Sequence, residues 1–169
     1  KFFLEQWFLI FRFQNRLNSK SLSKFQKIIP PKDRFWADPH IVFKNNTYYI
    51  FFEEFDYQQN KGHISYFTID QDGKYSKPTK IIEQPFHLSY PFVFEYENQM
   101  FMIPETQAKK SIQLYKCLKF PEKWEFLKNL LTDIDAVDST IFFYENKWWM
   151  FTGIRENIRS GWNNLHIFF

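Results

Sequence analysis

Acidic residues flank apolar runs at three places in this sequence. Asp38 precedes the apolar part of "FWADPHIVFKNNTYYIFFEEF" and Glu53 and Glu54 close it, while Asp138 and Glu105 stand at comparable ends of later runs. Several carboxyl groups in one partly buried cleft cannot all ionise freely, because repulsion and desolvation raise the pKa of at least one. The result is a proton donor beside an anion, the pairing that breaks glycosidic bonds. The sequence therefore predicts a carboxylate site whose candidate catalytic residues are Asp38, Asp138 and Glu105.

The acids belong to a repeat that occurs three times. "DPHIVFKNNTYYIFFEE" from Asp38, "YPFVFEYENQMFMIPET" from Tyr90 and "DSTIFFYENKWWMFTGI" from Asp138 align without a gap. Each has an apolar run, a polar turn with Asn at the same offset and an aromatic-rich second run, which is the pattern of a β-hairpin. Further strands are expected at "GHISYFTI", "SIQLYKCL" and "NLHIFF", and fourth strands at "PTKIIEQ" and "WEFLKNLL".

The spacing of the units indicates their architecture. They start 52 and then 48 residues apart, and a period near fifty made of four short strands is typical of a β-propeller blade. We therefore predict an all-β chain with an N-terminal strand and connector at 1–34, and blades at 35–87, 88–135 and 136–169, the last one truncated. One open meander or sandwich is the alternative, against which the equal offsets of the three units argue.

Closed propellers have about four to eight blades, more than these units supply. The third unit also stops at Phe169, within an expected strand, and the sequence begins without Met. A partial propeller exposes apolar edges that invite aggregation. We therefore expect this chain to be part of a longer protein with further C-terminal blades.

In a propeller the first strand of each blade lies innermost, so both ends of each hairpin open at the mouth of the channel. Pairing about the Asn turns is expected to set Asp38 opposite Glu53, Tyr90 opposite Glu105 and Asp138 opposite Gly153. Strand alternation sends Glu53 and Glu54 to opposite faces, so at most one is expected to act at the site. The candidate ligand-binding residues are Trp36, His40, Glu53, His87 and Tyr90.

For some candidate residues, a purely structural role is an alternative to a role in the site. Asp38 precedes Pro39, a pair common where a strand or turn begins, although Asp138 repeats the acid. Glu105 follows a proline in "IPET" and suits a solvated turn equally well. No metal-ligand spacing links the histidines, so no cofactor is predicted, and a calcium ion in the channel is an open alternative.

Composition excludes several classes of protein. The 22 Lys and Arg against 19 Asp and Glu are scattered singly, so no nucleic-acid partner is expected. The only cysteine, Cys117, excludes an intrachain disulfide and is expected to pack in a strand. The apolar segment "KFFLEQWFLIFRF" is too short to span a bilayer and is predicted to be a buried strand. Without a visible signal peptide or disulfide, a cytoplasmic location is slightly favoured.

Long phrases of the sequence resemble one family. They are "EQWFL", "PPKDRFWADPHIVFKNNTYYIFFEEF", "KGHISYFTID", "PFHLSYPFVFEYENQMFMIPET", "LYKCLKFPEKWEF" and "VDSTIFFYENKWWMFTG". In this order, and over nearly the whole chain, they resemble the N-terminal domain of glucosamine inositolphosphorylceramide transferases. More distantly, the Ala-Asp-Pro start of the first blade is similar to the five-bladed furanosidases of glycoside hydrolase family 43 and their sucrose-active relatives. The resemblance implies an incomplete, furanosidase-like five-bladed propeller concerned with carbohydrate, and a separate C-terminal transferase domain.

The hydrolase resemblance also implies roles for two acids. Asp38 matches the first-blade aspartate that serves as general base, and Asp138 matches the aspartate that tunes the acid's pKa and positions the sugar. The general acid of those enzymes is a glutamate on a later blade, beyond this chain, and Glu105 could replace it only in a rearranged site. Hydrolysis by this chain alone is therefore not expected.

We therefore expect a carbohydrate-binding or carbohydrate-processing domain of a glycoconjugate-assembly protein, with a glycan or glycoconjugate at the axial mouth. A furanosidase-type glycoside hydrolase and a non-catalytic scaffold for protein contacts are the alternatives. Asp38→Asn is expected to lower glycan binding or turnover severely, whereas Glu54→Gln is expected to do little.

Overall fold

The structure is a computed structural model that describes residues 5–13, 24–157, 161–162 and 164–169. These residues form β-strands and turns, include the short 3-10 helix η2 (Gln107–Lys109), and contain no α-helix. The predicted all-β class is therefore confirmed. Within the described ranges, no helix has the length and apolar character needed to cross a membrane.

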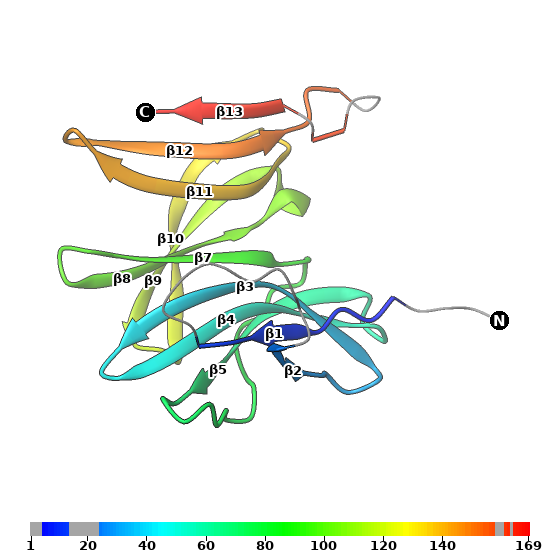
Figure 1. The fold of residues 1–169 in the computed structure, drawn as a ribbon. Helices are drawn as coiled ribbons and strands as arrows, with labels where there is room; N and C mark the ends of the chain where they lie inside the picture. Colours follow the sequence, from blue (N-terminus) through cyan, green and yellow to red (C-terminus); the bar gives the residue numbers. More distant parts are fainter. Residues whose placement is uncertain (1–4, 14–23, 158–160, 163) are drawn as a thin grey trace.

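Three antiparallel sheets follow one another along the chain (Figure 1). In each sheet the strands lie side by side in sequence order, as in a propeller blade. Blade 1 contains β3 (Arg34–Lys44), β4 (Thr47–Asp56), β5 (Lys61–Ile69) and β6 (Thr79–Ile82); blade 2 contains β7 (Ser89–Tyr96), β8 (Gln99–Glu105), β9 (Ser111–Lys119) and β10 (Lys123–Thr132); blade 3 contains β11 (Ala136–Tyr144), β12 (Lys147–Ile154) and β13 (Asn164–Phe168). A separate two-stranded sheet of β1 (Leu9–Phe11) and β2 (Gln26–Ile28) precedes them.

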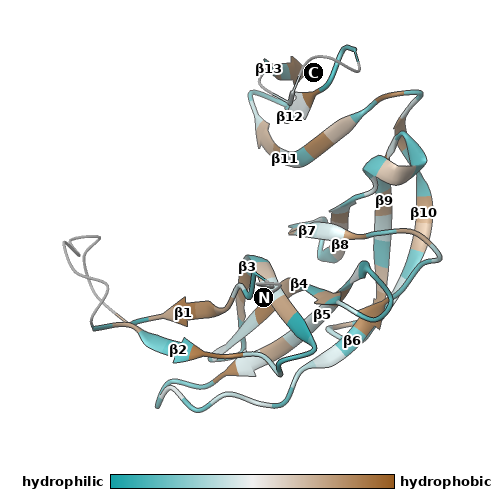
Figure 2. Cartoon of the chain, turned by 90° about the vertical axis from the view of Figure 1, so that its right-hand side faces the viewer, coloured by the Kyte–Doolittle hydropathy of each residue, from teal (hydrophilic) through white to brown (hydrophobic). Residues whose placement is uncertain are grey.

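The blades share one inner side. Figure 2 shows the chain curving so that β3, β7 and β11 lie on its concave side, with β6 and β10 on the convex side. Contacts join the first strands of neighbouring blades. Lys44 Nζ of β3 pairs with Glu95 Oε2 of β7 at 3.1 Å, and Tyr90 Oη of β7 lies 2.9 Å from Thr140 Oγ1 of β11. The predicted partial propeller, with about three blades, is therefore confirmed.

Apolar side chains fill the spaces between the sheets. Phe51 of blade 1 and Met102 of blade 2 are both fully buried in the cluster between their blades, which also contains Cys117, as predicted. Ile103 and Ile154 belong to a second cluster, between blades 2 and 3. Burying one such side chain stabilises a fold by about 1.5–3 kcal/mol, so packing between blades helps to hold the inner strands in place.

The N-terminal segment is less buried than its composition predicted. In its described part only Leu9 is buried, in a cluster against blade 1. Trp7 is 61% exposed and Phe8 is 42% exposed. The prediction of a buried strand is therefore wrong for most of the described part of the segment, because β1 is short and packs only Leu9 and the partly buried Phe11 against the blade; residues 1–4 lie outside the described residues.

Two-residue turns close the three inner hairpins. Both residues of each turn have positive φ: 51° and 57° at Asn45–Asn46, 50° and 61° at Glu97–Asn98, and 48° and 59° at Glu145–Asn146. Two successive left-handed residues make the type I′ turn, whose twist matches that of the flanking strands and which favours Asn. The Asn that recurs in the sequence therefore corresponds to the same type of turn in all three hairpins.

Each first strand has a bulge near its start, and this bulge makes the strand pairing differ from the predicted one. Asp38, Tyr90 and Asp138 have φ values of 50°, 42° and 54°, and the register shifts at each of them. The observed partners are Ala37 with Glu53, Ser89 with Glu105 and Val137 with Gly153. The prediction that Asp38, Tyr90 and Asp138 occupy these positions is wrong by one residue, because the bulge sets two residues against one on the paired strand.

Candidate functional site

Four acidic side chains from three blades form the candidate site, which we call the acidic mouth. They are Asp38 of β3, Glu53 of β4, Glu105 of β8 and Asp138 of β11. The charge of Asp38 contributes to a raised pKa at each of the other three groups. The four carboxyl groups, spread over a hundred residues of sequence, therefore act on one another electrostatically.

The bulges present the two aspartates of the acidic mouth to solvent. Asp38 and Asp138 are exposed at left-handed positions, a conformation that Asp and Asn adopt more readily than other residues with side chains. Blade 3 also braces its bulge with hydroxyl groups. Thr152 Oγ1 donates to Val137 O at 2.8 Å and lies 2.9 Å from Ser139 Oγ. Asp therefore suits these two positions, but the backbone does not require it, because Tyr90 adopts the same left-handed conformation in the bulge of blade 2.

Glu53 is the most strongly perturbed acid of the acidic mouth. Its residue is only 5% exposed, and burial, followed by the charges of Asp38 and Glu105, raises its pKa to about 8. A hydrogen bond with Asp38 acts in the same direction, because only protonated Glu53 can donate to a carboxylate. At neutral pH Glu53 is therefore mostly a neutral hydrogen-bond donor.

Glu105 links blade 2 to blade 3. Burial, then the charge of Asp138, raises its pKa to about 7, against the lowering effect of hydrogen bonds from the Asp138 backbone N–H and from Ser89. The pKa of Asp138 is itself raised, first because its carboxyl group is partly desolvated although the residue is exposed, and then by the charge of Asp38. Glu105 thus gains and loses a proton near neutral pH while it is bound to the backbone of the neighbouring blade.

His87 supports Glu53 from the end of blade 1. The backbone N–H of Gly62 donates to His87 Nδ1 at 2.9 Å, so in the neutral ring the proton is on Nε2. That nitrogen lies 3.6 Å from Glu53 Oε1. Burial lowers the pKa of His87, although the Asp38 charge opposes this. Gly62 is needed here, since a Cβ would lie 2.5 Å from Leu88 O and 2.9 Å from Glu53 Oε1.

Other predicted ligand-binding residues have structural contacts. Trp36 is 5% exposed and packs in the cluster between blade 1 and the β1–β2 sheet, apart from the acidic mouth. The His40 ring lies edge-on to Phe92 at 4.9 Å, and burial lowers its pKa. Tyr90 bonds to Thr140 of blade 3. The structure thus brings Glu53 and His87 to the acidic mouth and uses Trp36 in a core.

Glu54 is equally buried but belongs to a different cluster. Its Oε1 accepts from Arg34 Nη1 at 2.9 Å and Trp36 Nε1 at 3.2 Å, and its Oε2 lies 2.6 Å from Ser65 Oγ and 3.1 Å from His63 Nε2. Burial would raise the pKa of Glu54, but these hydrogen bonds outweigh it and lower the pKa to about 2. Glu54 is therefore an ionised structural carboxylate.

A cavity beside the acidic mouth contains a residue that the sequence patterns did not single out. The cavity measures about 510 Å³ and is lined by Glu105, Val137, Asp138, Gly153, Trp162 and Leu165. Trp162 lies in the connection between β12 and β13, outside the three repeated hairpins. Because Trp162 is not part of the repeat, the sequence pattern could not identify it as a site residue. In the described part of the chain, no three His, Cys, Asp or Glu side chains are arranged to hold a metal ion.

The raised pKa of Glu53 predicts how stability depends on pH. Between about pH 4.5, its ordinary pKa, and about pH 8, the folded chain keeps a proton that the unfolded chain releases, so the free energy of unfolding falls as pH rises. We expect Glu53→Gln, which copies the neutral carboxyl group, to flatten this decline. Urea unfolding between pH 5 and 8.5 measures it, with the exposed residue Glu125 as a Glu→Gln control. Parallel curves for the wild type and Glu53→Gln would contradict the expectation.

Comparison with protein families and curated proteins identifies relatives. The family model described as "Glucosamine inositolphosphorylceramide transferase 1, N-terminal" matches residues 23–169. Glucosamine inositolphosphorylceramide transferase 1 of Oryza sativa subsp. indica is 36% identical over 118 residues, which are 69% of this chain and 16% of that protein. The Arabidopsis thaliana protein of the same name is 33% identical over 117 residues, 69% of this chain and 15% of that protein. The matched region thus spans about one sixth of these relatives.

Solved structures show the same fold at low sequence identity. A thermostable family-43 glycoside hydrolase superposes with a TM-score of 0.66 and 18% identity, over 88% of this chain and 60% of that one. An exo-1,5-α-L-arabinanase from a bovine ruminal metagenomic library superposes with a TM-score of 0.54 and 11% identity, over 90% and 61%. These similarities confirm the predicted furanosidase-like propeller fold and extend to the fold alone.

Proposed function

Because this chain belongs to the glucosamine inositolphosphorylceramide transferase N-terminal family, it is a glycan-related propeller domain, and we propose that it binds a glycan at the acidic mouth. The curated relatives are named as glucosamine inositolphosphorylceramide transferases. In the proposal, this domain holds the sugar part of a glycoconjugate for an enzyme that extends it.

The observation that carries the proposal is the convergence of Asp38, Glu53, Glu105 and Asp138 from three blades. Sugar hydroxyls both donate and accept hydrogen bonds, so a sugar-binding site needs both kinds of partner. Neutral Glu53 supplies a donor at neutral pH, since its pKa is raised to about 8, and a carboxylate such as that of Asp38 accepts. Hydrogen bonds to charged groups contribute more than neutral ones, about 1.5–3 kcal/mol each.

The charge of the acidic mouth predicts its selectivity. Among the described residues, the only basic side chain paired with its four acids is His87. A ligand that brings a negative charge would meet repulsion from partly desolvated carboxylates. We therefore expect neutral and amino sugars to bind at least about tenfold more tightly than uronic acids or sugar phosphates.

Titrations followed by saturation-transfer NMR test both the proposal and its selectivity. Suitable probes are methyl β-D-glucopyranoside, glucosamine, glucuronic acid and glucose 1-phosphate, each titrated into the 169-residue chain at neutral pH. Binding of the first two with weak binding of the acidic pair supports the proposal. Equal affinity for all four would contradict the selectivity, and no binding of these or of furanosides such as methyl α-L-arabinofuranoside would leave the scaffold alternative in its place.

Glycoside hydrolysis is a second candidate, favoured by the pKa pattern. Glu105, with a pKa of about 7, lies beside the ionisable Asp138, and such a pair can provide a general acid and an anion. Release of nitrophenol from aryl glycosides measures this activity. Hydrolysis that Glu105→Gln abolishes would favour the candidate, whereas sugar binding without turnover would favour the recognition domain.

A further inference from the structure

The repeat of three hairpins is broken at one position of the acidic mouth. Glu53 in blade 1 and Glu105 in blade 2 occupy equivalent positions, paired with Ala37 and Ser89. The equivalent residue in blade 3 is Gly153. Blade 3 therefore has a hydrogen atom where the other two have a long acidic side chain.

The missing side chain coincides with open space. The cavity of about 510 Å³ lies at this position, with Gly153, Glu105 and Asp138 in its lining. A Cβ on Gly153 would approach Val137 Cγ2 to 3.1 Å and Trp162 Cβ to 3.6 Å. The tight approach is to Val137, whereas the distance to Trp162 is an ordinary contact. The absence of a third glutamate leaves room beside Asp138.

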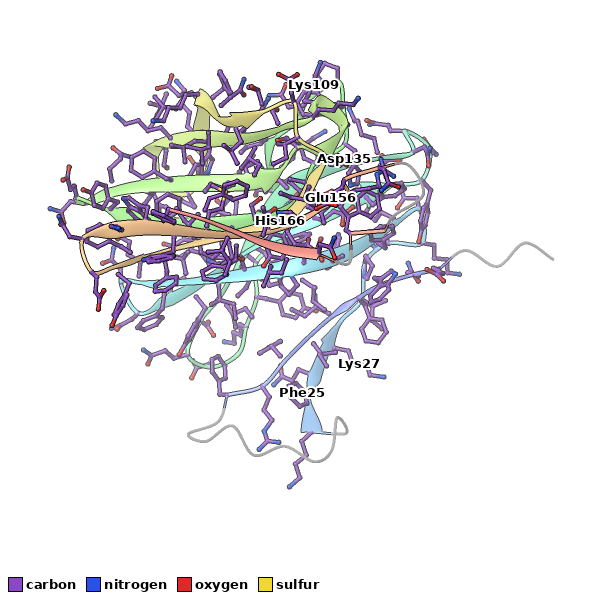
Figure 3. The ribbon with its side chains drawn as sticks, turned by 90° about the horizontal axis from the view of Figure 1, so that it is seen from above. Phe25, Lys27, Lys109, Asp135, Glu156 and His166 are labelled. Atoms are coloured by element: carbon purple, nitrogen blue, oxygen red, sulfur yellow. The ribbon has the colours of Figure 1, made fainter. Side chains whose placement is uncertain are left out.

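Trp162 is held in place by a charged cluster at the same end of the molecule. Its Nε1 donates to Asp135 Oδ1 at 3.3 Å, and the Arg155 guanidinium lies over its ring at 4.5 Å. Asp135, labelled in Figure 3, also accepts from Gln107 Nε2 and Arg155 Nε, both at 2.8 Å. The indole is thus positioned before any ligand arrives, which reduces the entropy that binding costs.

We propose that this cavity is a sugar-ring subsite in which Trp162 contacts the apolar face of the ring while Glu105 and Asp138 bind its hydroxyl groups. The inference rests on the proposed function and adds to it the place of the ring and the aromatic residue that holds it. Trp162 is 41% exposed and lines the cavity, so part of its surface is free for such a contact.

The chemistry of the lining matches a sugar ring better than other small ligands. A pyranose or furanose has apolar C–H surface and a hydroxyl-bearing edge, and the cavity offers an indole with Val137 and Leu165, and two carboxyl groups. Its volume lies within the usual range for small-molecule sites, about 300–1,000 Å³. Glu105 and Asp138 disfavour anionic ligands, and the polar lining disfavours a purely apolar one.

Substitution of Trp162 tests the subsite. In the 169-residue chain we expect Trp162→Ala to weaken binding of methyl β-D-glucopyranoside or glucosamine about tenfold, and Trp162→Phe, which keeps an aromatic face, to weaken it about threefold or less. Trp7→Ala is the matched control, because Trp7 is also an exposed tryptophan, at 61%, but precedes β1. Saturation-transfer NMR gives the dissociation constants, and circular dichroism verifies folding.

The outcomes separate the subsite from the proposed function. If the wild type binds none of the neutral, amino or furanoside sugars, the proposed function fails. If it binds and Trp162→Ala behaves like Trp7→Ala, the subsite is overturned while the proposed function stands. Should Trp162→Ala not fold, tryptophan fluorescence decides: a change on sugar binding that is lost in Trp162→Phe supports the subsite, and a change that persists unaltered overturns it.

Discussion

Glu54→Ala should lower the free energy of unfolding by about 3–5 kcal/mol, the usual cost of removing one partner from a buried ion pair. The substitution leaves the hydrogen-bond donors of Arg34, Trp36 and Ser65 without their acceptor. Among the described residues, the Arg34 charge would then be paired only with Asp33, 48% of whose side chain is exposed. Urea unfolding at pH 7 measures the loss.

Two further variants make this test specific. Glu95→Ala removes another glutamate with a 3.1 Å ion pair, to Lys44, but at an exposed site, where such pairs contribute about 0–1 kcal/mol. Glu54→Gln should lie between them, because its amide can accept from Arg34 and Trp36 and donate to Ser65. Equal losses for Glu54→Ala and Glu95→Ala would show that the buried cluster does not hold blade 1 together.

The same carboxylate sets the acid side of the stability profile. The folded pKa of Glu54, about 2, lies below its ordinary value of 4.5. Its stabilising contribution is therefore fully present above about pH 4.5 and is lost as the pH falls toward 2. This sign is opposite to that of Glu53, whose contribution falls as the pH rises to about 8. The expectation that Glu54→Gln does little therefore concerns ligand binding only.

Asp38→Asn should weaken glycan binding about tenfold to a hundredfold, the loss expected when a charged hydrogen-bond acceptor becomes a neutral amide. Asparagine is the informative replacement, because Asp38 has a φ of 50° and Asn tolerates the left-handed conformation almost as well. Asp38→Ala would combine lost charge with backbone strain. Saturation-transfer NMR with the sugar that the wild type binds measures the effect.

A control and a second readout accompany Asp38→Asn. Asp72→Asn changes an exposed aspartate in the turn between β5 and β6 and should leave binding unchanged. Because the Asp38 charge helps to raise the pKa of Glu53, Glu105 and Asp138, its removal should also shift the pH profile of binding to lower pH. Unaltered affinity and pH profile in Asp38→Asn would place the ligand elsewhere.

Much of this fold could be predicted from the sequence, because the turn and strand patterns that specify it are local. Asn at the second turn position, as in Asn46, Asn98 and Asn146, meets the need of a type I′ turn for positive φ. The period near fifty residues then orders the hairpins as blades. Since first strands of neighbouring blades share one inner side, Asp38 and Asp138 could be expected at one end of the molecule from sequence alone.

Register and burial, by contrast, depended on packing. Asp38 and Pro39 in "WADPH" fit a bulge, a turn or the start of a strand equally well. The bulge that forms shifts the partner of Glu53 from Asp38 to Ala37. Alternation placed Glu53 and Glu54 on opposite faces, but it could not say that each face would be covered. That follows from the neighbouring sheets, which bury both glutamates to 5% exposure.

The amino-acid order is thus enough to specify a set of hairpins with acids at their ends, since turn chemistry and strand alternation act over a few residues. The tertiary structure alone decided which acid stays ionised, because a carboxyl pKa responds to donors and charges brought from other strands. It also decided that Trp36 lies in a core and Trp162 at the cavity. The two tryptophans differ in the strands and loops that surround them, and a short stretch of sequence does not specify those neighbours.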